Sequence, residues 1–195
     1  MGKDNIKSDN VYGELMSQEL IFLKPDGIKR SLVGTVIERF EKAGFKIVKM
    51  RKGRISKELS ELLYQDSKNQ LEGMGAKTTK AMAEKGEKAR IMQLFGTEVP
   101  FEIGKQLNQW NRAYATSSDV IAVILEKEGD AVTEARAIVG KTDPAISPKG
   151  TIRGDFAADS IYRANTEKRA CENVVHASDV DTAEMDIENF EKHFF

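Results

Sequence analysis

The sequence predicts an α/β (α+β) domain built on a four-stranded sheet. Four apolar segments, at residues 19–23, 45–52, 119–125 and 174–175, have the composition of strands. Stretches with apolar residues at helical spacing separate them, so that the order strand, helix, strand occurs twice. Two such split βαβ units give one sheet, and helices on one face of it are the natural way to bury its apolar side chains.

The first strand, at residues 19–23, is expected to end at a turn. Residues 24–27 read KPDG, a turn by composition, because Pro fixes φ and Gly tolerates positive φ. Ser31 is the expected N-cap of the next helix, whose apolar residues recur at helical spacing. Gly44 fits the position after its last turn, so the helix is expected to end there and the second strand to follow.

Residues 65–100 differ in composition from the rest of the chain. They are rich in Lys, Gly, Ala and Met with weak periodicity, so we expect an inserted, partly helical and exposed segment. A helix that Ser56 caps and that ends near Tyr64 precedes the segment. A helix with an apolar stripe follows it, formed by Ile103, Leu107, Trp110 and Tyr114.

The second half of the chain completes the predicted sheet. The strand at residues 119–125 is followed by a helix that ends at Gly140. Residues 141–171 hold two of the four prolines and are predicted to be irregular, and such long segments are usually functional or disordered. Asp181 and Glu184 resemble a capping box, which predicts a last helix after the fourth strand.

Composition excludes several classes of protein. Thirty basic and 31 acidic residues give a net charge of −1, so no overall basic field favours nucleic acid. Cys171 is the only cysteine, which excludes an internal disulfide and a Cys-based zinc site. We expect residues 1–17 to form a polar tail and residues 18–195 the domain. That tail lacks the apolar core of a signal peptide and no apolar run could span a membrane, which favours a cytoplasmic protein.

The segment at residues 173–179, NVVHASD, is the strongest candidate for chemistry. Two valines lead into His176, and a polar turn and a helix start follow. A histidine at such a strand end faces a cleft, and neutral imidazole is a nucleophile that titrates near physiological pH. A lone histidine after two valines is more often structural, so the rest of the chain has to decide between these interpretations.

Four motifs together resemble the nucleoside diphosphate kinase family. They occur in the family's order, and they are KPDG at 24–27, RSLVG at 30–34, GTIRGDF at 150–156 and NVVHASD at 173–179. The resemblance covers about residues 19–64 and 101–190, and it is closest to longer, archaeal-like forms of the family. It implies a ferredoxin-like βαββαβ sandwich with an antiparallel sheet.

The resemblance also implies an activity. The family moves the γ-phosphate of a nucleoside triphosphate to a nucleoside diphosphate by a ping-pong route through a phosphohistidine. His176 would be the nucleophile, Tyr64 would stand beside it, and Ser178 would support it from behind. Asp186, which replaces the family's usual glutamate, would orient the imidazole.

The remaining implied roles concern the nucleotide. Lys24 would contact both the transferring phosphate and the sugar hydroxyl, Asn173 would bind the sugar, and Phe101 would stack on the base. The phosphates would be bound by Arg136, Thr142 and Arg153. Mg²⁺ would be held mainly by the phosphates of the nucleotide. A base bound by stacking alone would allow the enzyme to accept nucleotides with different bases.

Each of these residues also has a structural interpretation when taken singly. Lys24 could be a solvated turn residue, Tyr64 a core residue, and Arg153 a clamp on a backbone carbonyl. Their joint match to one pattern favours the nucleotide site.

Two other functions remain open on the sequence. The first is a nucleotide-binding or regulatory protein that has lost catalysis, since Asp186 and Glu172 both depart from the family pattern. The second is a nucleic-acid-binding module that uses the Lys-rich segment at 65–100, against which the balanced charge argues. The expected partners are nucleoside di- and triphosphates and further copies of the chain, in a hexamer or a smaller dimer-based assembly.

Overall fold

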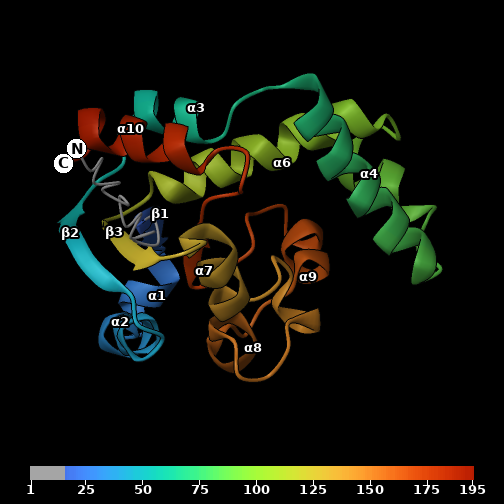
Figure 1. Cartoon of the computed structure of the whole chain (residues 1–195). Coiled ribbons are helices and arrows are strands. Elements are labelled where there is room, and N and C mark those ends of the chain that lie inside the picture. The colour runs from blue at the N-terminus through green and yellow to red at the C-terminus, as the bar shows by residue number, and fades with distance from the viewer. Residues whose placement is uncertain (1–15) are drawn as a thin grey trace, which may run out of the picture.

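A computed structural model describes residues 16–195, and its four strands form one sheet (Figure 1). The strands are β1 (Met16–Leu23), β2 (Lys46–Gly53), β3 (Val120–Glu128) and β4 (Val175–Ala177). Their order is β2-β3-β1-β4, and every neighbouring pair is antiparallel. The predicted four-stranded antiparallel sheet is therefore confirmed. Of the expected tail, residues 1–15 lie outside the described part, and Met16 and Ser17 already belong to β1.

Helices cover both faces of the sheet, so the expectation of helices on one face is wrong (Figure 1). The run Leu20–Leu23 in β1 explains why, since all four side chains are apolar and 0% exposed. A strand without alternating polar residues has to be covered from both sides. One face is packed by α2 (Val33–Lys42) and α7 (Ala131–Val139), the other by α3 (Lys57–Leu63) and α10 (Ala183–His193).

The turn predicted after β1 is in fact the start of a helix, α1 (Pro25–Lys29). Pro25 occupies its first turn, where the fixed φ of proline suits a helix and a backbone N–H is not needed. Ser31 is not an N-cap, because its φ is 57° and α2 begins after Leu32. The composition of this stretch indicated residues that interrupt regular structure. It did not show that a helix of five residues forms between β1 and α2.

Of the helix caps predicted at the starts of α3 and α10, the first is formed and the second is not. Ser56 caps α3 as expected, and its hydroxyl accepts the N–H of Leu59 at 3.1 Å. The capping box at Asp181 and Glu184 is not formed. Thr182 is the N-cap of α10 instead; its side chain accepts no backbone N–H, and its hydroxyl donates to the carboxylate of Asp186 at 3.1 Å.

The segment at residues 141–171 is less irregular than predicted. It contains a 3₁₀ turn at Pro144–Ile146 and two short helices, α8 (Ile152–Phe156) and α9 (Ile161–Thr166). Hydroxyl groups of Thr151 and Ser160 cap these helices. Helices of five or six residues are too short to show a period, so local capping rather than hydrophobic patterning defines them.

The segment at residues 65–100 is partly helical, as expected, but it is not simply exposed, because both of its helices bury apolar side chains. It forms α4 (Lys68–Glu84) and α5 (Arg90–Phe95), which pack on α6 (Pro100–Ala115) at some distance from the sheet (Figure 1). These helices share a small core of their own, formed by Met82, Ile91, Leu94, Phe95, Ile103 and Leu107. Among residues 16–195, no helix is long and apolar enough to cross a membrane.

Two glycines allow α4 and α6 to approach closely. A Cβ atom added at Gly75 would lie 1.9 Å from the backbone oxygen of Pro100. One added at Gly104 would lie 2.0 Å from the backbone oxygen of Leu71. The backbones thus meet directly, without side chains between them.

We expect Gly75→Ala to lower the free energy of unfolding by about 1–3 kcal/mol, because the added methyl group forces the two backbones apart. Gly73→Ala in the same helix meets no atom within 4 Å and should instead raise it by about 0.5–1 kcal/mol through helix propensity. Urea denaturation of both variants checks the prediction. Equal effects of the two substitutions would contradict the close approach.

Candidate active site

His176 lies in the middle of β4, and its ring packs against aromatic side chains. Phe22 is its partner in the β1–β4 register, and the two rings stack with centroids 4.6 Å apart. Phe190 of α10 stacks behind Phe22, and Tyr64 presents its ring to His176 at 6.5 Å. Part of the His176 side chain is exposed, while its Nε2 is buried with no hydrogen-bond partner in residues 16–195. Packing therefore fixes the imidazole plane.

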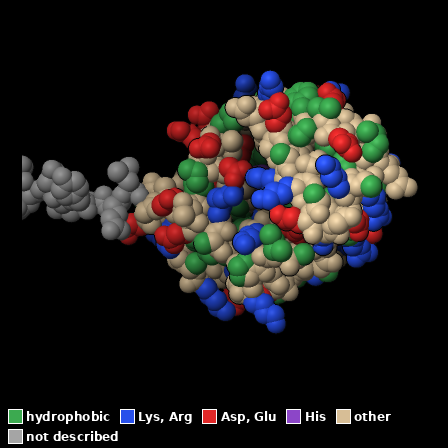
Figure 2. Space-filling view, turned by 90° about the vertical axis from the view of Figure 1, so that its right-hand side faces the viewer, with side chains coloured by type: hydrophobic (Ala, Val, Ile, Leu, Met, Phe, Trp, Pro, Cys, Tyr) green, Lys and Arg blue, Asp and Glu red, His purple; other side chains and the backbone are tan. Residues whose placement is uncertain are grey.

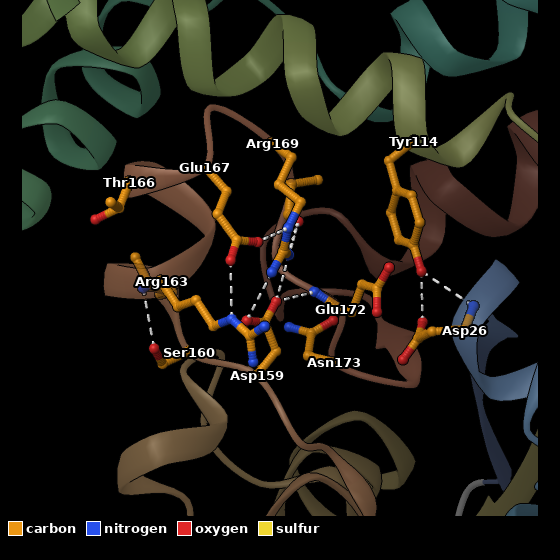
Figure 3. Close-up of polar contacts among 12 residues, drawn as sticks. Asp26, Tyr114, Asp159, Ser160, Arg163, Thr166, Glu167, Arg169, Glu172 and Asn173 are labelled. Atoms are coloured by element: carbon orange, nitrogen blue, oxygen red, sulfur yellow. Dashed lines mark hydrogen bonds and ion pairs between the residues drawn. The ribbon is translucent and has the colours of Figure 1, made fainter. Parts of the chain in front are cut away.

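The loop before β4 is tied to α1 and α6, and Figure 3 shows the part of this link between Tyr114 and Asp26. The N–H of Lys24 donates to the backbone oxygen of Val174 at 2.8 Å, and the N–H of Val174 donates to the carboxylate of Asp26 at 2.9 Å. The hydroxyl of Tyr114 donates to the other carboxylate oxygen of Asp26 at 2.7 Å. These bonds hold Val174 at φ 70°, which is unusual for a β-branched residue. At Gly27, a Cβ would lie 2.7 Å from the Val174 oxygen, so glycine is required.

Three of the residues predicted to bind nucleotide are joined by hydrogen bonds. The ammonium group of Lys24 donates to Oδ1 of Asn173 at 2.8 Å. The Nδ2 of Asn173 donates to the backbone oxygen of Thr142 at 2.9 Å. Asn173 is buried and Thr142 is exposed, so the row runs from the interior to the surface.

The two predicted arginines hold the backbone on either side of His176. Arg136 donates to the backbone oxygen of Ser178 at 3.0 Å and pairs with the carboxylate of Asp179 at 2.5 Å. Arg153 is 8% exposed, and its guanidinium holds backbone carbonyl groups, which is the structural role that the sequence left open for it. It donates to the backbone oxygens of Gly140 and Val175 at 3.0 and 2.9 Å.

Positive charge concentrates around the imidazole. Burial, and then the charges of Lys24, Arg153 and Arg136, lower the pKa of His176 well below its ordinary value, so the ring is neutral at physiological pH. Burial and Arg153 also lower the pKa of Lys24 to about 8. Burial and Arg136 lower the pKa of Arg153 to about 10. Cations that destabilise one another in this way favour an anion between them.

Figure 2 shows Lys and Arg side chains around a hollow on one face of the molecule.

The structure also contains a cavity of about 600 Å³ beside α1, which is lined by Lys29, Arg30, Lys52 and Arg54 together with acidic residues. None of the residues predicted to act in catalysis lines it, so this cavity is separate from the site at His176.

Ion pairs fix the stretch between α9 and β4 (Figure 3). Arg169 pairs with Asp159 at 2.6 Å and with Glu167 at 2.7 Å. Asp159 also accepts the N–H of Glu172 at 2.9 Å, which anchors the backbone directly before Asn173. Glu172 itself is exposed.

Of the predicted site residues, Tyr64 alone within residues 16–195 has a ring contact with His176, and Asp186 and Phe101 have other partners. Asp186 is 4% exposed and accepts a hydrogen bond from Thr182. Burial raises its pKa. Phe101 lies in the first turn of α6, where the ammonium group of Lys105 is 5.6 Å from its ring centroid.

Several contributors to the site were missed in the sequence. Phe22 forms the floor under the imidazole, and Tyr114 had been taken for one member of the apolar stripe on α6. Glu19, which is 0% exposed, accepts the N–H of Ser178 at 2.7 Å. An acidic residue at the start of a wholly apolar strand was the available signal for Glu19.

The described residues offer phosphate ligands rather than metal ligands. Residues 16–195 contain no group of three His, Cys, Asp or Glu side chains that could hold a metal ion. The side chains near His176 are instead cations and amides, the groups that bind phosphate oxygens.

Comparison with known proteins agrees with this chemistry. The family model described as "Nucleoside diphosphate kinase" matches residues 17–93 and 102–194. A nucleoside diphosphate kinase of Pyrobaculum aerophilum is 41% identical over 84% of this chain and 88% of its own length. The crystal structure of an NDP kinase from the same organism superimposes with a TM-score of 0.84 at 37% identity, covering 90% of this chain and 96% of the other.

A Borrelia burgdorferi nucleoside-diphosphate kinase, solved as a transition-state mimic with vanadate and ADP, shares the fold. The two structures superimpose with a TM-score of 0.67 at 24% sequence identity, and the match covers 93% of this chain and 88% of the Borrelia chain. The family model spans nearly all of the described residues, and it includes residues 65–93, which the resemblance had left out as part of an insertion. The sheet is antiparallel, as the resemblance implied. The chain therefore belongs to the nucleoside diphosphate kinase family.

Proposed function

We propose that this nucleoside diphosphate kinase acts through a phosphohistidine on His176. The observation that carries the proposal is a neutral imidazole placed among three cations, which can attack a phosphorus atom while the developing charge is neutralised. Since Nε2 is buried, Nδ1 is the attacking atom. The bond from the γ-phosphorus to the bridging oxygen breaks, and nucleoside diphosphate leaves. In the second half-reaction, a terminal oxygen of the acceptor diphosphate takes the phosphoryl group and frees the imidazole.

The other residues hold the nucleotide. Lys24 and Asn173, already bonded to each other, are placed to contact the transferring phosphate and the sugar. Arg136, Arg153 and Thr142 contribute positive charge and a hydroxyl for the phosphates. Arg136 first has to release its pair with the exposed Asp179, which a polyphosphate can replace.

The remaining predicted residues complete the proposed site. Tyr64 lines the site with its phenol protonated, because burial raises the pKa of that group. Ser178 and Asp186 lie behind the imidazole, and Phe101 stacks on the base. Phosphates that contact these cations would bring Mg²⁺ as their own counterion, and bound Mg²⁺ would neutralise charge on the transferring group. We place the enzyme in the cytoplasm.

The half-reaction tests the proposal directly. The protein is mixed with Mg²⁺ and γ-labelled ATP without an acceptor. We expect label on the protein that is stable in base, labile in acid, and released by GDP. His176→Ala should carry no label, whereas His193→Ala, which changes an exposed histidine at the end of α10, should label like the wild type. Label that persists in His176→Ala would contradict the assignment.

The same experiment addresses the alternative of a protein that has lost catalysis. ADP binding measured by calorimetry, together with a complete absence of label in the wild type, would establish a nucleotide-binding protein instead.

Binding of ADP should weaken as the pH rises through about 8. Lys24 is charged below that pKa and loses its proton above it, while Arg153 titrates only near 10. The loss of affinity should approach about tenfold per pH unit above 8.5. Lys24→Gln should bind more weakly and lack this dependence. Calorimetry across the pH range measures both proteins, and parallel curves would exclude Lys24 from the phosphate site.

We also propose that the chain forms homo-oligomers through β2. This strand lies at the edge of the sheet, and Val48 and Met50 are 47% and 53% exposed on it. An exposed apolar edge strand is a surface that pairs with another chain. Light scattering should give a multiple of 21.7 kDa for the wild type and a smaller mass for Met50→Arg. Met92→Arg, at an equally exposed position on α5, should leave the mass unchanged.

A further inference from the structure

Glu19 is a buried carboxyl group to which the proposed mechanism gives no task. It lies on β1, and its side chain is 0% exposed. Its Oε1 accepts the N–H of Ser178 at 2.7 Å. Its Oε2 is buried and has no hydrogen-bond partner among residues 16–195. A buried carboxyl group with an unpaired oxygen is unfavourable, so its presence requires an explanation other than filling space.

The residue that Glu19 contacts is part of the turn that follows His176. Arg136 binds the same turn from the other side, through the backbone oxygen of Ser178 and the carboxylate of Asp179. The hydroxyl of Ser178 is buried close to the carboxyl group of Asp186, and this side-chain contact lowers the pKa of Asp186 against the effect of burial. The turn is thus held at its amide by Glu19 and at its carbonyl by Arg136, two residues beyond the proposed nucleophile.

A purely structural role explains these contacts poorly. The N–H of Ser178 already has a second acceptor, the backbone oxygen of Leu20 at 3.3 Å. An apolar side chain of the same volume would fill the space without leaving an unpaired oxygen, and such replacements of buried polar groups are often neutral or stabilising. The carboxyl therefore costs stability and calls for a compensating function.

The charge state of the group follows from its surroundings. Burial raises the pKa of Glu19 to about 9, against the opposing effect of the Ser178 amide. Asp186 of α10 and Asp179 raise this pKa further, whereas Arg136 of α7 lowers it. A protonated carboxyl has a donor to offer, and buried acceptors of Ser178 and Asp186 lie in this part of the site.

We propose that Glu19 is a positioning residue for phosphoryl transfer, whose buried carboxyl group holds the Ser178 turn and thereby fixes the direction in which His176 faces the phosphate. The inference rests on the proposed role of His176. Glu19 contacts neither nucleotide nor reacting atoms, so its effect should fall on the chemical step rather than on nucleotide binding.

Two substitutions of similar volume separate the alternatives. Glu19→Gln keeps a neutral acceptor and a donor, whereas Glu19→Met keeps only the volume. Both are compared with the wild type in thermal stability, ADP affinity, the rate of the labelling half-reaction, and kcat and KM of the full reaction.

We expect Glu19→Met to fold with at least wild-type stability and to bind ADP within about twofold, but to lose about tenfold or more in labelling rate and kcat. Glu19→Gln should stay within about threefold of the wild type at pH 7. The ratio of its kcat to that of the wild type should grow from pH 8 to 10, because Glu19 ionises in the wild type and the glutamine does not. Other titrations, including that of Lys24, cancel in this ratio.

Three results would overturn the inference. If Glu19→Met kept the kcat of the wild type, the side chain of Glu19 would only fill space. Equal loss in both variants would show that an ionised carboxylate is required. Glu19→Met that has lost stability and catalysis in parallel would show a structural role. If the wild type carries no label at all, the proposed function fails and the inference falls with it, whereas normal labelling of the wild type confines a failure to Glu19.

Discussion

The carboxylate of Asp26 holds together the three elements on which the site depends. One oxygen accepts the backbone N–H of Val174 before β4, and the other accepts the hydroxyl of Tyr114 from α6, while Asp26 itself lies in the first turn of α1. The strained φ of Val174 persists because these bonds fix both of its neighbouring peptide groups. The position of His176, two residues further on, follows from this contact and from the pairing of β4 with β1.

A cost in electrostatic energy accompanies this arrangement. Lys24, Arg136 and Arg153 lie near one imidazole, and burial together with a neighbouring cation lowers the pKa values of Lys24 and Arg153, so the free protein disfavours their charge. The backbone oxygens of Gly140 and Val175 offset part of that cost at Arg153. Under the proposed function, the same guanidinium would hold the backbone in the free protein and contribute charge to phosphate binding.

Much of the fold could be predicted from the sequence, because the strands and longer helices bury regular patterns of apolar residues. The four strands, the helix that Ser56 caps and the helical insertion were all expected. Short elements such as α8 and α9 depend on single hydroxyl caps and have no period. Motifs likewise singled out the residues of the proposed site, but not the partners that hold them. The bond from Thr182 to Asp186 and the burial of Glu19 depend on distances between segments far apart in sequence, which a pattern does not contain.

The pairing of β1 with β4 also has a consequence for biosynthesis. Lys24 and Asn173 are 149 positions apart, and Glu19 and Ser178 are 159 apart. A ribosome that has reached Cys171 has already made every cation of the site and the whole inserted helical unit, yet has not made the strand that carries the imidazole. Closing so long a loop is slow, because its entropy is lost before any contact compensates it. A nucleotide can therefore bind the site of the complete chain, but it cannot direct the folding of the chain during synthesis.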